Sequence, residues 1–259
     1  MFELTREVRL VLPLGADEFA SSTINGHAGY PGGDSLACFV TVQATLAGEP
    51  DPTTGYLINI KDVDRAIRGQ GFEFLRDSMR KNRTAAAEVA RGMFDLLAAP
   101  WPNMSGLRLG LSPYTSVSIE KAEHPMVRLS RKFEFSAAHR LHNPDLTPQA
   151  NVDLFGKCNN PHGHGHNYEL EVTIAGKSPS TSLIPIDKLD QIVFAQVIQK
   201  FDHKFLNIET PEFSTLNPTV ENIAATIHHL LKAKLAEAGA TLAAVTVWET
   251  PKTSCRYSE

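Results

Sequence analysis

The segment CNNPHGHGHNY, residues 158–168, places one cysteine and three histidines within nine positions. His164 and His166 lie two apart at the expected start of a strand, so both side chains leave the same face and can reach one ion. His139 ends the strand-like segment FEFSAAH and supplies a third imidazole if the two strands pair. Three imidazoles with one open position are typical of catalytic zinc. Two surface histidines at a glycine-rich turn are the alternative interpretation.

Further candidates for proton transfer flank the histidines in the sequence. Lys157 precedes Cys158, and a neighbouring cation favours the thiolate, although a small buried residue is the alternative. Asp202 and His203, in KFDHKFLN after an expected helix, offer a carboxylate and an imidazole together, as acid–base catalysis requires. A solvated pair at a helix end would explain them equally well.

Glu249 is a carboxylate on an otherwise apolar strand, VTVWET. A buried carboxylate there has to find hydrogen-bond donors or become protonated. Glu249 is therefore a candidate for gripping a ligand that presents adjacent N–H groups.

The chain contains an internal repeat. The strand-like runs FVTVQATLAG (39–48) and NYELEVTIAG (167–176) end in the same Ala-Gly turn signal. Each is followed by a connection rich in Pro, Ser and Thr, then by an expected second strand and helix start in YLINIKDVDRAI (56–67) and LIPIDKLDQIV (183–193). Within them, Asp64 matches Asp190. The later matches are 87–97 with 221–231, both amphipathic helices, and 107–119 with 245–257, both strands followed by Pro-x-Thr-Ser.

The repeat predicts two modules, 1–125 and 126–259, with the boundary at Pro125. Each module has the order strand, strand, helix, helix, strand, strand. Because alternating strands need one face covered, we expect an α+β fold, in which each module is a four-stranded antiparallel sheet with two helices on one face.

Composition limits the function classes. The chain has 42% hydrophobic residues, 21% charged residues and a formal net charge of -4, which gives no general attraction to nucleic acid or an anionic membrane. No run approaches the length of a spanning helix, and acids interrupt the first twenty residues where a signal peptide is apolar. We expect a cytoplasmic protein that acts on a small molecule. Three cysteines, Cys38, Cys158 and Cys255, argue against a disulfide framework.

The motifs SAAHRLHNP, FGKCNNPHGHGHNYELEVTIAG, DHKFLN, TVENIA and VWET together resemble the 6-pyruvoyltetrahydropterin synthase family, which includes 6-carboxytetrahydropterin synthase of queuosine and deazaguanine synthesis. The resemblance covers residues 127–259. It implies two tandem modules of the tunnelling fold (T-fold), in which modules assemble into rings whose strands form a barrel with the helices outside.

The resemblance also implies roles for single residues. His139, His164 and His166 resemble the zinc ligands, and Cys158 resembles the general base. His162 looks like the spare imidazole, because the ligand pair of the pyruvoyl enzymes is followed by Asn-Tyr, as His166 is here, although His162 is also a candidate for lining the site. The carboxy enzymes have a shorter spacing from cysteine to histidine, and this chain has a histidine at both spacings.

Other residues resemble the substrate site and the proton relay. Asp202 and His203 resemble a relay that a neighbouring module often supplies. Glu249 resembles the pterin anchor, with its two oxygens facing the ring N–H and the amino group. Thr219 and Glu221 resemble the residues that shape the pocket. The family's second Thr is Val220 here, and Arg140 and Lys157 are candidates for meeting a triphosphate.

The implied activity is a zinc-dependent lyase reaction that converts 7,8-dihydroneopterin triphosphate to 6-pyruvoyltetrahydropterin with loss of triphosphate. Formation of 6-carboxytetrahydropterin from the same substrate is the alternative enzyme. A pterin- or zinc-binding module without turnover is the alternative from another class.

The first module lacks the matching ligands. Leu36 and Cys38 stand where the second module has His164 and His166, and Leu111 replaces the glutamate. We therefore expect a non-catalytic first module that supplies ring-closing strands. A chain with two modules needs half as many copies per ring, so a homo-oligomer is expected, with a trimer if the family hexamer is preserved.

Overall fold

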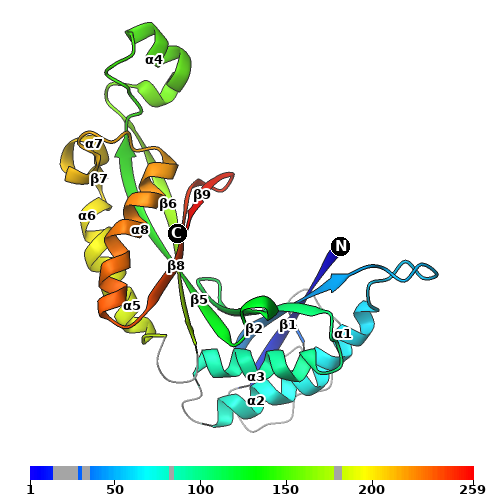
Figure 1. The fold of residues 1–259 in the computed structure, drawn as a ribbon. Helices are drawn as coiled ribbons and strands as arrows, with labels where there is room; N and C mark the ends of the chain where they lie inside the picture. The colour runs from blue at the N-terminus through cyan, green and yellow to red at the C-terminus, as the bar shows by residue number, and fades with distance from the viewer. Residues whose placement is uncertain (14–28, 31–35, 82–84, 178–182) are drawn as a thin grey trace. The chain divides into compact units, whose positions relative to one another are not determined.

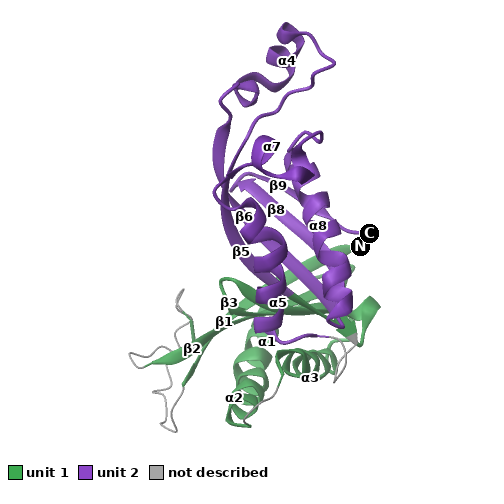
Figure 2. Ribbon diagram, turned by 90° about the vertical axis from the view of Figure 1, so that its left-hand side faces the viewer, with its two compact units in different colours: residues 1–129, 176–180 green, residues 130–175, 181–259 purple. Residues whose placement is uncertain are grey.

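The computed structural model describes residues 1–13, 29–30, 36–81, 85–177 and 183–259. The chain divides into two compact units (Figure 2). Unit 1 comprises residues 1–129 and 176–180, and unit 2 comprises residues 130–175 and 181–259. None of the helices within these residues is long and apolar enough to cross a membrane.

Unit 1 contains a four-stranded antiparallel sheet with helices on one face (Figure 1). Val8, Leu10 and Leu12 alternate with more exposed residues along the first strand and are buried, as expected for a strand with one covered face. The elements are β1 (Phe2–Pro13), β2 (Ala37–Gly48), α1 (Ile60–Ala66), the π-helical turn η1 (Ile67–Gly71), α2 (Phe72–Arg80), α3 (Ala86–Ala98), β3 (Met104–Ser112), β4 (Thr115–Glu120) and η2 (Lys121–Glu123).

Unit 2 repeats this order. Its main strands lie in the order β5-β6-β8-β9, and a short β7 pairs with β5 in parallel. Helices α5 and α8 lie side by side on one face of the sheet (Figure 2). The strands are β5 (Met126–His139), β6 (His164–Lys177), β7 (Lys204–Phe205), β8 (Thr241–Thr250) and β9 (Thr253–Tyr257). The helices are α4 (Pro148–Phe155), η3 (Gly156–Asn159), α5 (Ile186–Val193), η4 (Phe194–Ile198), α6 (Gln199–Phe201), α7 (Leu206–Glu209), η5 (Pro211–Phe213) and α8 (Val220–Glu237).

The two units carry the same ion pair at matched positions. In unit 1, Arg6 Nε and Nη2 donate to the two carboxylate oxygens of Asp64 at 2.7 and 2.8 Å. In unit 2, Arg131 forms the same bidentate pair with Asp190 at 3.0 and 2.8 Å. Asp64 and Asp190 are the residues that the repeat matches in sequence. A π-helical turn also follows α1 in unit 1 and α5 in unit 2, the two helices that contain the matched aspartates, which supports the internal duplication.

One part of the predicted element order is wrong. The expected second strands at the start of 56–67 and 183–193 are irregular, and helices begin at Ile60 and Ile186 instead. In 183–193, Pro185 takes the N-cap position of α5; a proline there offers no N–H to a sheet ladder. The second strand of each unit is the predicted 39–48 or 167–176 segment, and the first is β1 or β5.

Candidate metal centre and active site

The three predicted imidazoles come from two neighbouring strands of unit 2. His139 is the last residue of β5, and His164 is the first residue of β6. His164, His166 and Tyr168 alternate along β6 and therefore share one face. Tyr168 and His139 are fully buried, which identifies this face as the inner one.

Gly163 fixes the turn that delivers His164 to this face. Its φ of +73° is in the left-handed region, which favours glycine. A Cβ at this position would lie 2.9 Å from the Phe205 ring and 3.1 Å from the carbonyl oxygen of His139. Gly163, directly before His164, thus permits close approach of β6 to the end of β5.

The imidazoles converge on one point. The Nε2 atoms of His139 and His164 lie 3.1 Å apart, and one ring nitrogen from each of the three histidines lies within 4.8 Å of the others. Nδ1 of His139 lies 2.7 Å from the carbonyl oxygen of Pro218. A carbonyl accepts only, so Nδ1 carries the hydrogen and Nε2 presents its lone pair toward the cluster.

Burial favours the neutral form of two of these imidazoles, His139 and His164. It lowers the pKa of His139 to about 4, and the neighbouring His164 and His166 lower it further, against the raising effect of the Pro218 carbonyl. Burial also lowers the pKa of His164. Neutral imidazole is the form that binds metal ions. The lowered pKa values of His139 and His164 therefore favour metal binding over protonation.

The donor set fits a zinc-like ion. Nε2 of His166 is buried without a hydrogen-bond partner. Ligand atoms about 2.0–2.1 Å from a tetrahedral ion lie roughly 3.4 Å apart, close to the 3.1 Å between the Nε2 atoms of His139 and His164. Imidazole nitrogens suit zinc and similar transition metals better than magnesium or calcium.

Glu249 lies beside the imidazoles. Its Oε1 is 3.3 Å from Nε2 of His139 and 3.5 Å from Nε2 of His166; the second contact lacks hydrogen-bond geometry. Glu169 and Trp248 are partners in the β6–β8 ladder, so Glu249 follows on the same face as Tyr168. The carboxylate predicted to anchor a pterin thus adjoins the predicted ligands.

Cys158 lies in η3, where its carbonyl accepts from Leu141 N–H at 2.8 Å. Burial, and next the Glu249 carboxylate, raise the pKa of the Cys158 thiol. The prediction that Lys157 favours the thiolate is therefore wrong. Lys157 is exposed to solvent, and the charged group that affects the pKa of the thiol is the Glu249 carboxylate.

Asp202 and His203 form a pair at the edge of β5. Asp202 Oδ1 accepts from the N–H of Ser136 at 2.8 Å, and Oδ2 lies 2.9 Å from Nδ1 of His203. The Ser136 hydrogen bond lowers the pKa of Asp202. The His203 side chain is 81% exposed and its φ is +58°, a conformation that is uncommon outside glycine and often found at functional sites. His203 and His166 line one open hollow of the sheet edge.

Thr219 and Glu221 lie at the N-terminus of α8. Thr219 is the N-cap of α8, and its Oγ1 accepts from Asn222 N–H at 3.3 Å. Glu221 is exposed in the first turn, where its charge contributes to raising the pKa of Cys255. Thr219 is adjacent to Pro218, so the cap lies next to the carbonyl that orients His139.

Other predicted residues lie apart from the imidazole cluster. His162 is exposed, with its N–H bonded to Asn160 Oδ1 at 3.1 Å. Arg140 is held by Asn159, to whose carbonyl and side-chain oxygens it donates at 3.2 Å each. Two residues that the sequence does not predict also belong to the site: Pro218, and Tyr168, whose hydroxyl lies 3.4 Å from Nδ1 of His139. Pro218 lies just before α8, and the local sequence does not show that this part of the chain packs against the end of β5.

Within the described residues, both groups able to hold a metal ion lie in unit 2: the three histidines, and a second cluster of His228, His229 and Glu259. In unit 1, Leu36 is 88% exposed, and Cys38 and Leu111 occupy the positions matched to His166 and Glu249. The residue matched to His139 lies outside the described residues.

Comparisons with known proteins match the second half of the chain. The model of the family described as 6-pyruvoyl tetrahydropterin synthase matches residues 128–259. The 6-pyruvoyl tetrahydrobiopterin synthase of Drosophila melanogaster is 36% identical over 138 residues, which cover 52% of this chain and 82% of that protein. A 6-carboxy-5,6,7,8-tetrahydropterin synthase of Haemophilus influenzae is 31% identical over 156 residues, covering 52% and 100% respectively.

A solved uricase, the hyper-thermostable AgUricase mutant, aligns over 100% of this chain and 91% of its own with a TM-score of 0.52 and 8% identity. At that identity the likeness concerns the fold alone. Because the uricase fold is also a tunnelling fold, the alignment over both units confirms the predicted α+β fold with two tandem modules.

Proposed function

Because the chain belongs to the 6-pyruvoyl tetrahydropterin synthase family, we propose that it is a lyase that converts 7,8-dihydroneopterin triphosphate to 6-pyruvoyltetrahydropterin and triphosphate. The observation that carries the proposal is the convergence of His139, His164 and His166 on one point beside Glu249. A family member that had lost its activity would have no requirement to keep this set together.

His139, His164 and His166 would hold a zinc ion through ring nitrogens. The Pro218 carbonyl keeps Nδ1 of His139 protonated and so directs Nε2 to the ion. When bound, zinc supplies a Lewis acid that polarises the oxygens of the substrate side chain. The buried Nε2 of His166, which has no hydrogen-bond partner, supports this assignment.

Cys158 would act as the base that moves protons between the side chain and the pterin ring. Its thiol pKa is raised in the metal-free chain by burial and by Glu249. Pairing of Glu249 with the N–H groups of a pterin, or a cation nearby, would withdraw that charge from the thiol and favour the thiolate. Substrate binding would thus switch on the base.

Asp202 and His203 would complete the proton relay. Asp202 is fixed by the Ser136 N–H and orients the His203 ring through Nδ1. The free Nε2 of His203 is then available for exchange with solvent or substrate. The hollow that His203 shares with His166 supports a role within the same unit, while a role at a neighbouring module of the assembly stays open.

The rival reaction forms 6-carboxytetrahydropterin from the same substrate, and the identity to the Haemophilus enzyme supports considering it. Incubation of zinc-loaded protein with dihydroneopterin triphosphate, followed by mass spectrometry, separates the alternatives. A pyruvoyl product supports the proposal. A carboxy product with acetaldehyde supports the rival, and unchanged substrate supports a binding module without turnover.

Unit 1 would be non-catalytic and would contribute strands to a ring formed by several chains. Because each chain has two modules, three chains would replace the six of single-module relatives. The protein would act in the cytoplasm. Some described residues of unit 1 match the three histidines or Glu249 of unit 2. Among these, Cys38 is the one whose side chain could bind a metal ion. Cys38→Ala should leave zinc per chain and turnover unchanged, and a loss of either would refute the assignment. Light scattering should give three chains per particle, and a monomer at micromolar concentration would contradict the ring.

A further inference from the structure

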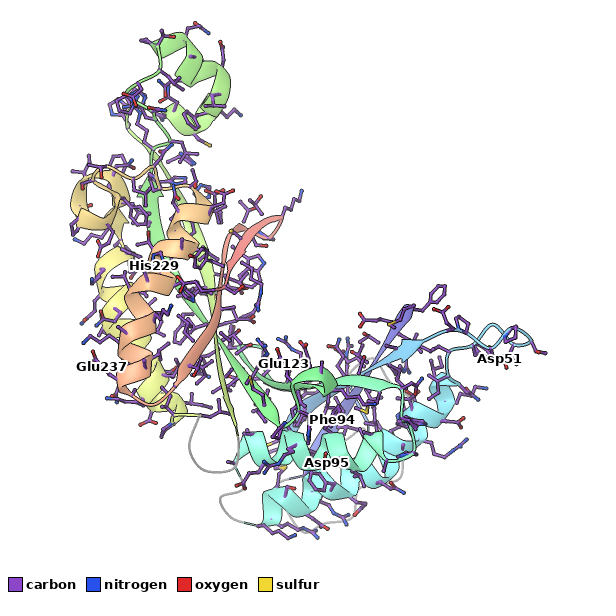
Figure 3. All side chains as sticks on the ribbon, in the orientation of Figure 1. Asp51, Phe94, Asp95, Glu123, His229 and Glu237 are labelled. Atoms are coloured by element: carbon purple, nitrogen blue, oxygen red, sulfur yellow. The ribbon has the colours of Figure 1, made fainter. Side chains whose placement is uncertain are left out.

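A second cluster of potential ligands lies between the last helix and the end of the described chain. His228 and His229 are consecutive on α8, and Glu259 follows β9 (Figure 3 labels His229). One ligand atom from each lies within 4.8 Å of the others. The Tyr257 ring packs edge-on against both imidazoles, with centroids 5.0 and 5.7 Å away. We call these three residues the α8 cluster.

His228 is the unexplained member of the α8 cluster. Its side chain is 1% exposed, and neither ring nitrogen has a hydrogen-bond partner. Buried polar groups are nearly always satisfied, so an orphaned imidazole needs an explanation. Burial lowers the pKa of His228 against the raising effect of Glu259, while His229 and Lys232 also lower it. The lowered pKa favours the neutral ring, which has a lone pair to offer.

Glu259 divides its two oxygens between different partners. Oε1 lies 3.2 Å from Nε2 of His229 and 3.9 Å from Nδ1 of His228. Oε2 is contacted by Nζ of Lys232. The oxygen that faces the imidazoles is therefore not the one that Lys232 neutralises, which suits coordination of an ion through one oxygen.

We propose that His228, His229 and Glu259 form a second metal site, separate from the His139 triad, for a divalent transition-metal ion such as Zn²⁺. Two imidazoles and one carboxylate are an established zinc donor set, and imidazole ligands select against magnesium and calcium. The ion would satisfy His228 and tie the residues after β9 to α8. This site does not depend on the proposed enzymatic function.

Lys232 provides an internal test of the site. Its ammonium is beside the carboxylate that would bind the ion, so it repels a bound cation and competes for Glu259. Lys232→Met keeps the aliphatic stem and removes the charge. We expect the second ion to bind at least severalfold more tightly in this variant, whereas a cluster that serves only as an ion-pair network has no reason to gain zinc affinity.

The experiment measures zinc per chain. The full chain is stripped with a chelator, equilibrated at low micromolar free Zn²⁺ and analysed by plasma mass spectrometry, with circular dichroism as the check of folding. Wild type should hold two ions. His229→Ala and Glu259→Gln should each hold one and keep wild-type turnover, because neither residue belongs to the triad. His124→Gln is the matched control, since His124 pairs with Asp95 in unit 1 without a second imidazole, and should hold two.

Three results would overturn the proposal. The first is one ion in wild type, and the second is two ions in both His229→Ala and Glu259→Gln. The third is unchanged or weaker zinc binding in Lys232→Met. If one surface variant fails to fold, the other gives the same answer, because both residues are exposed and contribute separate ligands.

Discussion

Replacement of Thr219 separates a structural role from a substrate-binding role. Its hydroxyl caps α8 by accepting from Asn222 N–H at 3.3 Å, at the long end of hydrogen-bond distances. We therefore expect Thr219→Ala to lower the free energy of unfolding by about 0.5 to 1 kcal/mol, the lower part of the range for lost N-caps. Thr219→Ser keeps the cap and is the control.

The same change should reach the metal centre indirectly. A frayed first turn of α8 loosens the Pro218 carbonyl, which lies 2.7 Å from Nδ1 of His139. Loss of an outer-shell partner of a ligating imidazole typically weakens metal binding about 10-fold or more, so partial loosening should weaken zinc binding by up to about 10-fold. KM for the pterin should change little at saturating zinc.

Unfolding of unit 2 can be followed by urea titration with Trp248 fluorescence in a Trp101→Phe background, because the chain has two tryptophans, one in each unit. Zinc affinity is measured by competition with a chelating dye. The reasoning is refuted if Thr219→Ala unfolds like wild type but raises KM about fivefold, the effect of one lost hydrogen bond of about 1 kcal/mol to the substrate.

Three other predictions concern the base, the pH dependence and the repeat. Cys158→Ala should lower kcat by about 10²-fold or more while zinc stays bound, and survival of activity would show that another group is the base. The metal-free chain should lose stability as pH falls from about 6.5 to about 4, because the unfolded His139 binds a proton in this range and the folded one, with its pKa lowered to about 4, does not. The loss should be at most about 3 kcal/mol, should be complete near pH 4, and should shrink in His139→Asn when followed by urea unfolding at pH 5 and 7.5. A double-mutant cycle of Arg6 and Asp64 should give a coupling energy of about 1 kcal/mol, larger than that of the more exposed Arg65–Asp62 pair; equal couplings would show that the lower exposure of the Arg6–Asp64 pair does not strengthen it.

Much of the site is readable from sequence because strand geometry is local. The spacing of His164 and His166 requires a shared face once a strand is assumed, and the segment FEFSAAH predicts an earlier strand that ends at His139. Asp64 and Asp190 are matched by sequence alone, and in the structure each forms an ion pair with an arginine of its own unit, Arg6 or Arg131. In these cases the periodicity of apolar residues determines both the element and the direction of its side chains.

Other features depend on contacts that are distant in sequence. The Pro218 carbonyl meets His139 across 79 positions, and no local pattern predicts that contact. The sequence places Lys157 beside Cys158, but burial, and next the Glu249 carboxylate from another strand, raise the pKa of the thiol. The short strands expected at the start of 56–67 and 183–193 do not form. The apolar residues there lead directly into the N-caps of α1 and α5 and do not pair with another strand.

The central claim is tested most directly by triphosphate release from dihydroneopterin triphosphate during stepwise addition of zinc to the stripped His229→Ala chain. This variant leaves the His139, His164 and His166 site as the one proposed to bind the ion. We expect release to rise linearly and reach a plateau at one zinc per chain, and to be absent in His164→Ala. Release without zinc, or no release at any zinc concentration, would contradict the account.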